Sequence, residues 1–474
     1  MDTTQQLGLR SGSSLAKKQR NYGEVTAYLD AHWKVPADKT LQRVAQLDKA
    51  LQMPSRKFPA ILVAGTNGKS LTIDFASRLL ANEGLTVGAY TTPYILLYKE
   101  QISINGKSIP SKLFAELGNE VINVAEDLGI EAHTSELLTM IALVVFQRHN
   151  VDVAVLEVNM ILSASDPVYI VNAKVGCITR ITPHNATLTE EQLIEVAQQV
   201  VTLVKPDMHI ISGDQSKATL QFLQKEVSVR RGHWAMPVRK LATLVYPFEQ
   251  LHGRCAALAE RIAQLFVEHH INRELSSDTQ SLLVRRTGQR GRPTRAAKRL
   301  QELNPKKTIE QFWKETATAL SGKFQLLDKE KPSVLLDTAS NVDAFKNLLL
   351  GIRLLHYQRP LKGLVIVIGA VKDTMYNEEF LKLVRYFFKK MSGQIFICPP
   401  GDAIPGCQEE DSWNVEEVET AIKAMKVKSR SCRSAEEAFD LAKKSVDERD
   451  GLVAICGSQS IIATYWNAKG IKKL

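Results

Sequence analysis

Short apolar segments alternate with longer amphipathic segments along most of this chain. A short, continuous apolar run predicts a buried strand, whereas apolar residues three and four positions apart predict a helix packed on a sheet. The first half of the pattern predicts strands at 60–64, 86–90, 151–158, 174–181 and 208–212, with helices at 70–83, 112–128, 136–149 and 189–204. This alternation is typical of an α/β fold with a mainly parallel sheet covered by helices on both faces.

The same alternation begins again further along the chain. It predicts strands at 333–337, 363–369, 394–398 and 451–456, and helices at 343–356, 376–390, 414–425 and 434–446. Between the two patterns, 276–307 is polar, basic and weakly periodic, which predicts a long insertion. At 474 residues the chain is too long for one ordinary core. We therefore expect a flexible tail at 1–20, a first domain at 21–320 that contains the insertion, and a smaller domain at 321–474.

The junction after the strand at 60–64 has the composition of a phosphate-binding loop. It consists of Gly65, Thr66, Asn67, Gly68, Lys69 and Ser70. Its glycines let backbone N–H groups approach phosphate oxygens, Lys69 supplies a charge, and the Ser70 hydroxyl can reach Mg²⁺. The following helix directs the positive end of its dipole at the same anion. The usual motif would place its first glycine at Val63, so the loop by itself also fits an ordinary strand–turn–helix junction.

An acidic residue, Glu157, ends the apolar strand at 151–158. Carboxylates are seldom buried in this way without a partner or a ligand. Nucleotides bind parallel sheets at the carboxyl ends of the strands, and both Glu157 and the phosphate loop lie at such ends. We therefore expect the two to converge on one site.

Several segments resemble one known family, and they occur in the family's order from about Asn21 to the C-terminus. The phosphate loop resembles that of the Mur ligases and their relatives, the folylpolyglutamate and dihydrofolate synthases. The folate branch is the better match, on 90–94, 100–109, 134–139, 151–158, 337–341 and 457–458. On these segments the chain is identified as a divergent member of that branch. The resemblance implies a Mur-ligase-like ATP-binding domain with a mainly parallel sheet, and a smaller Rossmann-like C-terminal α/β domain.

The resemblance also implies an activity. Such an enzyme is an ATP-dependent carboxylate–amine ligase that uses ATP and Mg²⁺ and adds glutamate to a folate or dihydropteroate through an acyl phosphate. Two anions meet in the first step, so the site needs cations and a metal ion. Two alternatives stay open: a catalytically degenerate relative that binds nucleotide or folate without turnover, and a ligase with a different acceptor.

Residue roles carried over from the family fall into three groups. Lys69, Glu157 and His184 are the candidate catalytic residues, and Ser70, Thr92, Glu157 and His184 are the candidate metal ligands. The candidate nucleotide-binding residues are Gly65, Thr66, Asn67, Gly68, Lys69, Ser70, Lys323, Asp337 and Asn341. Plainer roles compete with some of these: His184 as a loop residue, Thr92 as a turn residue before Pro93, and Asp337 as the cap of the next helix.

The chain also departs from the family's pattern. The segment 159–166 lacks the family's glycines and arginine, Val200 aligns with its carbamylated lysine, and Ser340 replaces a histidine. The adenine-contacting pattern is not recoverable around 251–255, and Lys323 stands in for an arginine, which it cannot match as a bidentate donor. We therefore place turnover in doubt, and hypothesise that Lys205 or the basic insertion supplies the missing charge.

Composition narrows the class of protein. Apolar residues make up 44% and charged residues 24% of the chain, the balance of a globular protein, and no apolar run is long enough to span a membrane. Six cysteines without paired or metal-ligand spacing indicate a reduced, cytosolic protein. The first 20 residues lack a secretory apolar core, although a transit peptide remains an alternative to a frayed tail. A monomer is the family's default state.

The formal net charge of +10 raises the question of a nucleic-acid partner. A basic cleft also suits anionic small molecules such as nucleotides and folates. Much of the excess charge lies in 285–299, where Arg290-Gly291-Arg292-Pro293 resembles the core of the minor-groove-binding AT-hook. We favour a solvated loop for this segment and do not expect nucleic-acid binding.

Overall fold

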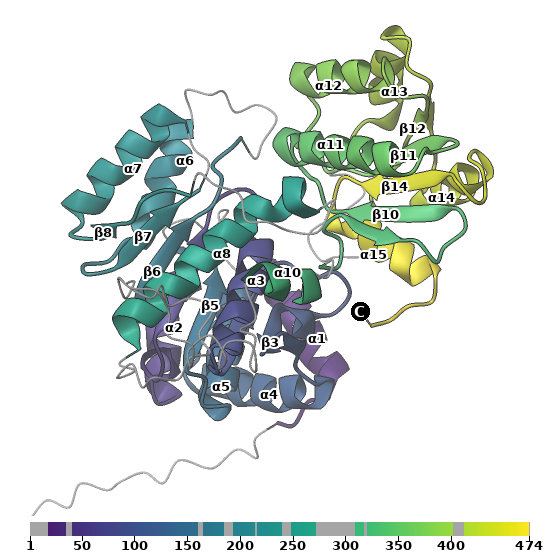
Figure 1. The fold of residues 1–474 in the computed structure, drawn as a ribbon. Coiled ribbons are helices and arrows are strands. Elements are labelled where there is room, and N and C mark those ends of the chain that lie inside the picture. Colours follow the sequence, from purple (N-terminus) through teal and green to yellow (C-terminus); the bar gives the residue numbers. More distant parts are fainter. Residues whose placement is uncertain are drawn as a thin grey trace, which may run out of the picture.

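The chain forms two α/β parts, each built around its own sheet (Figure 1). The computed structural model describes residues 18–34, 40–159, 165–183, 193–213, 216–238, 248–271, 309–316, 320–401 and 412–473. We call the described residues up to 316 the N-terminal domain and those from 320 onward the C-terminal domain. The basic insertion predicted at 276–307 and its arginine-rich segment lie outside the described residues.

The N-terminal domain contains an eight-stranded sheet in the order β4-β3-β2-β5-β1-β6-β7-β8. Its strands are β1 (Ala60–Ala64), β2 (Val87–Tyr90), β3 (Ile102–Ile104), β4 (Lys107–Ser108), β5 (Val153–Glu157), β6 (Ala173–Ile178), β7 (His209–Ser212) and β8 (His233–Trp234). The neighbouring strands β2, β5, β1, β6, β7 and β8 pair in parallel, whereas β3 and β4 form an antiparallel edge. The predicted mainly parallel sheet is therefore confirmed.

The helices of the N-terminal domain are α1 (Tyr22–Ala31), α2 (Thr40–Ala50), α3 (Lys69–Asn82), α4 (Ser111–Asp127), α5 (Thr134–Arg148), α6 (Leu193–Val200), α7 (Lys217–Val229), α8 (Phe248–His270) and α10 (Ile309–Thr316). They cover both faces of the sheet, so β1 is buried along its whole length. Ile61 and Val63 face the core beneath α3, α8 and α10, whereas Leu62 and the alanines of β1 face the core beneath α2, α4 and α5. This two-sided burial explains why the strand is a continuous apolar run.

The C-terminal domain is also a sheet covered by helices on both faces, with six strands in the order β13-β12-β11-β14-β10-β9. Its strands are β9 (Gln325–Leu327), β10 (Ser333–Asp337), β11 (Leu364–Ile368), β12 (Gln394–Ile397), β13 (Ser429–Ser431) and β14 (Leu452–Cys456). Its helices are α11 (Val342–Gln358), α12 (Glu378–Phe388), α13 (Val415–Ala424), α14 (Ala435–Lys444) and α15 (Gln459–Ala468). Helices α11 to α13 pack on one face of the sheet, and α14 and α15 on the other.

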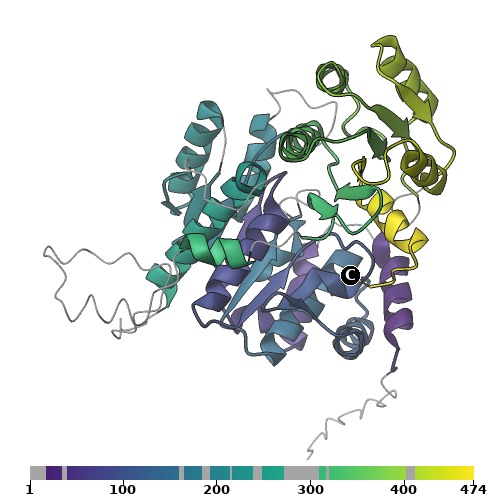
Figure 2. The ribbon, with the colours of Figure 1, turned by 45° about the vertical axis from the view of Figure 1, so that its right-hand side comes forward.

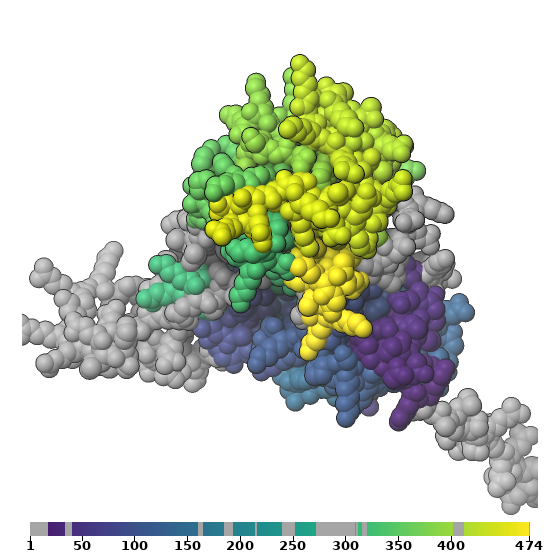
Figure 3. All heavy atoms as spheres, turned by 90° about the vertical axis from the view of Figure 1, so that its right-hand side faces the viewer, coloured from purple at the N-terminus to yellow at the C-terminus, as the bar shows by residue number. Residues whose placement is uncertain are grey.

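The C-terminal domain sits on the edge of the N-terminal domain where the parallel strands end (Figures 1 and 2). Figure 3 shows the green-to-yellow domain stacked on the purple-to-teal one, with the end of the chain reaching down beside the N-terminal domain. The turn between β10 and α11 faces the loop between β1 and α3, and side chains of the two turns are hydrogen-bonded. This junction positions the candidate site. Among the described residues, no helix is long and apolar enough to cross a membrane.

Candidate active site between the two domains

A cleft of about 1030 Å³ opens between the two domains. Its floor is the phosphate loop and the ends of β2 and β5, and one wall is the first half of α8. The opposite wall comes from the C-terminal domain, through the end of β10, the start of α11 and the turn before α15. A space of this size, lined by polar groups from two domains, is typical of a substrate site.

Two glycines give the phosphate loop a shape that other residues cannot adopt. Gly65 has φ +125°, and a Cβ there would lie 2.2 Å from Oγ1 of Thr179. Gly68 has φ +87°, and a Cβ there would lie 3.0 Å from Sγ of Cys255 on α8. Because both positions need a positive φ and close packing, the loop keeps its backbone open towards the cleft.

The structure brings three of the predicted site residues, Lys69, Ser70 and Thr92, together around the carboxylate of a fourth, Glu157. Glu157 is 4% exposed, and its Oε2 accepts the Ser70 hydroxyl at 3.0 Å and the Thr92 N–H at 3.4 Å. The Lys69 ammonium lies 3.6 Å from its Oε1 and donates to the Gly65 carbonyl at 2.9 Å. These contacts join the ends of three strands, as expected from the chain order. His184 lies outside the described residues.

The residues around Glu157 fit a magnesium ion in their chemistry. Mg²⁺ prefers oxygen ligands, takes one or two carboxylates, and completes its shell with water and phosphate oxygens. Glu157 supplies a carboxylate and Ser70 a hydroxyl group beside it, whereas Thr92 contacts the carboxylate through its backbone N–H. Within the described ranges, no group of three or more His, Cys, Asp or Glu side chains forms a ready cation site.

On the opposite wall, the C-terminal domain presents Asp337 and Lys323. Burial raises the pKa of Asp337 to about 6, although Lys323 and the N–H of Phe324, which donates at 3.0 Å, act in the other direction. Burial likewise lowers the pKa of Lys323, whose ammonium donates to Oγ1 of Thr338 at 2.5 Å. Asp337 does not cap the next helix: Asn341 is the N-cap of α11 and accepts the N–H of Ala344 at 2.9 Å.

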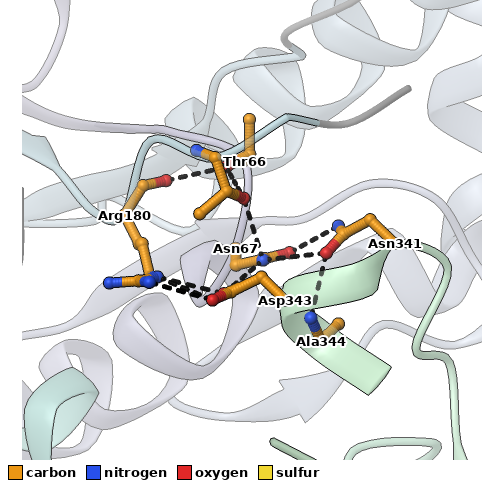
Figure 4. A network of polar contacts seen from close by, with 7 residues as sticks. Thr66, Asn67, Arg180, Asn341, Asp343 and Ala344 are labelled. Atoms are coloured by element: carbon orange, nitrogen blue, oxygen red, sulfur yellow. Dashed lines mark hydrogen bonds and ion pairs between the residues drawn. The ribbon is translucent and has the colours of Figure 1, made fainter. Parts of the chain in front are cut away.

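A network of polar contacts connects the two walls (Figure 4). The amides of Asn67 and Asn341 exchange hydrogen bonds of 3.1 and 2.8 Å, and Asn67 also donates to Asp343 at 2.9 Å. Arg180, which follows β6, donates from Nε to both oxygens of Asp343 at 3.0 Å. The sequence interpretation missed Arg180 and Asp343. The sequence did hold one signal for Arg180: like the phosphate loop and Glu157, it follows a strand predicted for the parallel sheet.

Beside Glu157, the altered segment 159–166 ends in a buried carboxyl group. Asp166 is 2% exposed and accepts the N–H of Asn159 at 2.5 Å and that of Val168 at 2.9 Å. Burial is the largest cause that raises its pKa to about 7, and the charge of Glu157 adds to it. Residues 160–164 lie outside the described residues.

The hypothesis that Lys205 supplies a missing charge to the site is wrong. The Lys205 ammonium donates to the carbonyls of Tyr169 and Val171, both at 2.6 Å, and it does not line the cleft. Its contacts hold the turn that follows Asp166. The described cations that line the cleft near the phosphate loop are Lys69, Arg180, Arg254, Lys323 and Lys346.

Comparison with known proteins gives this geometry a context. A dihydrofolate synthase/folylpolyglutamate synthase of Bacillus subtilis is 27% identical over 244 residues, which is 50% of this chain and 53% of that protein. The folylpolyglutamate synthase of Mycobacterium tuberculosis, solved with ADP, superposes with a TM-score of 0.73 at 19% identity over 95% of this chain and 98% of its own. The chain is a divergent relative of the folylpolyglutamate and dihydrofolate synthases. No family model matches it.

The relationship confirms the predicted fold class across both domains. The bifunctional folylpolyglutamate synthase/dihydrofolate synthase of Yersinia pestis, solved with AMPPNP and Mn, has a TM-score of 0.70 at 20% identity, over 95% of this chain and 98% of that one. By sequence, however, the chain spans about half the length of the curated relatives it matches. The architecture therefore follows from the structural likeness, whereas the activity rests on the site.

Proposed function

We propose that this chain is an ATP-dependent carboxylate–amine ligase that adds glutamate to a folate or dihydropteroate through an acyl phosphate. The observation that carries the proposal is the convergence of Lys69, Ser70 and Thr92 on Glu157, across the cleft from the C-terminal domain. The names of the curated relatives support the choice of substrates, and the nucleotides in the related structures support ATP.

In the proposed first step, the phosphate loop holds the triphosphate of ATP. Its backbone N–H groups and Lys69 bind the β- and γ-phosphates, and Glu157, with Ser70 and Thr92, would hold Mg²⁺. Bound there, the metal ion would neutralise charge on the phosphates. An oxygen of the acceptor's carboxylate attacks the γ-phosphorus and ADP leaves, which gives the acyl phosphate. Lys69 is already held towards the loop by the Gly65 carbonyl, so it needs little reorganisation.

In the proposed second step, the amine of glutamate attacks the acyl carbon, phosphate leaves, and the nitrogen loses a proton. Asp337 and Asn341 belong to the wall that closes over the nucleotide and helps to bind the incoming amino acid. An ionised Asp337 attracts an ammonium group, and its raised pKa makes this attraction sensitive to pH near 6. Lys323, beside it, offers a positive charge to the phosphates or to the carboxylates of the amino acid.

The expected monomeric state and cytosolic location remain parts of this proposal. Two observations support them. The five described cysteines are free thiols, which suits a reducing compartment. Both walls of the cleft come from one chain, so the site is assembled without a second copy.

The test is a ligation assay on the purified full chain. ATP, Mg²⁺, glutamate and either dihydropteroate or tetrahydrofolate are supplied, and phosphate release and product mass are measured. A glutamylated product that disappears in Lys69→Ala supports the proposal. Binding of nucleotide that depends on Lys69, without any product, overturns it in favour of a binding protein or of a ligase with another acceptor.

A further inference from the structure

Arg180 contacts the phosphate loop through its backbone. Its carbonyl accepts the N–H of Thr66 at 2.9 Å and the Thr66 hydroxyl at 2.9 Å, and Asn67 pairs with it in a short antiparallel bridge. The Thr66 hydroxyl in turn accepts the N–H of Thr182 at 2.8 Å. The loop is therefore fixed to the segment after β6 by contacts that do not involve the Arg180 side chain.

The Arg180 side chain points in the other direction, to the C-terminal domain (Figure 4). Its Nε lies 3.0 Å from each carboxylate oxygen of Asp343, and its Nη2 lies 2.9 Å from Oδ1. Such a forked, charge-assisted contact fixes orientation as well as distance. The guanidinium side chain is 38% exposed and that of Asp343 is 15% exposed, so solvent weakens the pair without removing its directionality.

Asp343 joins this ion pair to the phosphate loop a second time. Its Oδ2 accepts the Asn67 amide at 2.9 Å, and the same Asn67 exchanges two hydrogen bonds with Asn341 at the N-cap of α11. Any movement of the loop residue Asn67 therefore disturbs its hydrogen bonds with both Asp343 and Asn341. Cooperative networks of this kind couple the groups at their ends.

We propose that Arg180 and Asp343 are positioning residues that couple the phosphate loop to the C-terminal domain. The Arg180–Asp343 pair holds the amino-acid-binding wall in register with the loop, so that the incoming amine meets the acyl phosphate in the correct geometry. Neither residue needs to touch the reacting atoms. The role in turnover rests on the proposed ligase function, whereas the mechanical coupling does not.

The coupling is tested in the full chain with Arg180→Ala, Asp343→Asn and the double variant. Arg180→Ala leaves the backbone contacts to Thr66 in place, and Asp343→Asn retains an oxygen for the Asn67 amide. Arg359→Ala is the matched control, because Arg359 is also 38% exposed and pairs at 3.0 Å with Asp328 inside the C-terminal domain. Thermal unfolding of each variant establishes that it is folded.

The first measurement is the radius of gyration by small-angle X-ray scattering, with and without AMPPNP and Mg²⁺. We expect the two single variants to be more extended than the wild-type chain, and the control to be unchanged. This measurement needs no acceptor and no turnover, so it stands even if the ligase proposal fails. Single variants as compact as the wild type would overturn the coupling.

The second measurement separates positioning from nucleotide binding. In the ligation assay we expect the KM for glutamate to rise about tenfold in each single variant and no further in the double variant, since residues in one contact are not additive. The KM for ATP should stay within about threefold, because the backbone contacts that shape the loop remain. Additive losses, or a loss confined to ATP binding in Arg180→Ala alone, would mean that Arg180 acts on phosphate, and would overturn the proposal.

Discussion

The Ser70 hydroxyl donates to Oε2 of Glu157 at 3.0 Å, which joins the first turn of α3 to the end of β5. The sheet explains this meeting, because β1 and β5 are parallel neighbours with Val63 opposite Glu157. The loop that follows β1 therefore turns back over the carboxylate. Under the proposed function, this hydroxyl–carboxylate pair would supply two of the oxygen ligands of Mg²⁺.

Replacing Glu157 by Gln should weaken binding of the metal–nucleotide complex. The amide keeps an oxygen for the Ser70 hydroxyl but carries no charge, so we expect the apparent affinity for Mg²⁺ to fall at least tenfold, as loss of supporting groups at metal sites typically does. Nucleotide titrations at several Mg²⁺ concentrations measure this. Glu120→Gln, in the exposed pair of Glu120 with Arg148, is the control. An unchanged metal dependence would remove Glu157 from the ligand set.

Lys69→Ala should abolish useful turnover. Loss of one charged group that stabilises a transition state typically lowers the rate on the order of 10²–10³-fold. The substitution also removes the ammonium group that lies 3.6 Å from Glu157, which leaves this buried carboxylate without its cation. Phosphate release is the measurement, and Lys225→Ala, at an exposed position on α7, is the control. Equal rates in the two variants would contradict the role of Lys69.

Gly65→Ala should destabilise the fold as well as the site. Both its φ of +125° and the 2.2 Å approach of a Cβ to Oγ1 of Thr179 oppose a side chain. Gly106 separates the two effects, since it has φ +74° but no atom within 4 Å of the place where a Cβ would lie. We expect Gly106→Ala to cost about 1 kcal/mol and Gly65→Ala to cost about 2–3 kcal/mol or more. Denaturant unfolding measures both, and equal losses would show that the contact with Thr179 is relieved at no cost.

The sequence predicted the central strands of both domains because their signal is local, but it missed the short strands β3, β4, β8, β9 and β13 towards the sheet edges. β1, β5, β11 and β14 are buried on both faces, which requires continuous apolar runs. The long helix α8 was missed, although it packs on α3 and contacts the phosphate loop through Cys255. It also packs on β6 and β7, and no recoverable adenine-contacting pattern at 251–255 marked its first turns.

The candidate site was predictable where chemistry follows the chain order, and not where it depends on how the domains meet. Lys69, Ser70 and Glu157 follow strands that parallel pairing brings together. Arg180 and Asp343 have no motif of their own, and their contact exists only because the C-terminal domain lies against the strand ends. Lys205 shows the converse: a lysine near the correct position in the sequence is bound to carbonyls outside the cleft.

The buried carboxyl group of Asp166 should make stability fall as the pH rises. Its pKa is about 7 in the folded chain and near 4 when unfolded, so between these values the folded state binds the extra proton and loses stability as pH increases.

The variant Asp166→Asn does not titrate and serves as the reference. We therefore expect the free energy of unfolding of the wild type, relative to that of the variant, to decrease by roughly 2–3 kcal/mol from pH 5 to pH 8. Denaturant unfolding across this range measures the difference. A difference that is flat with pH would mean that Asp166 is ionised throughout, held by the N–H groups of Asn159 and Val168.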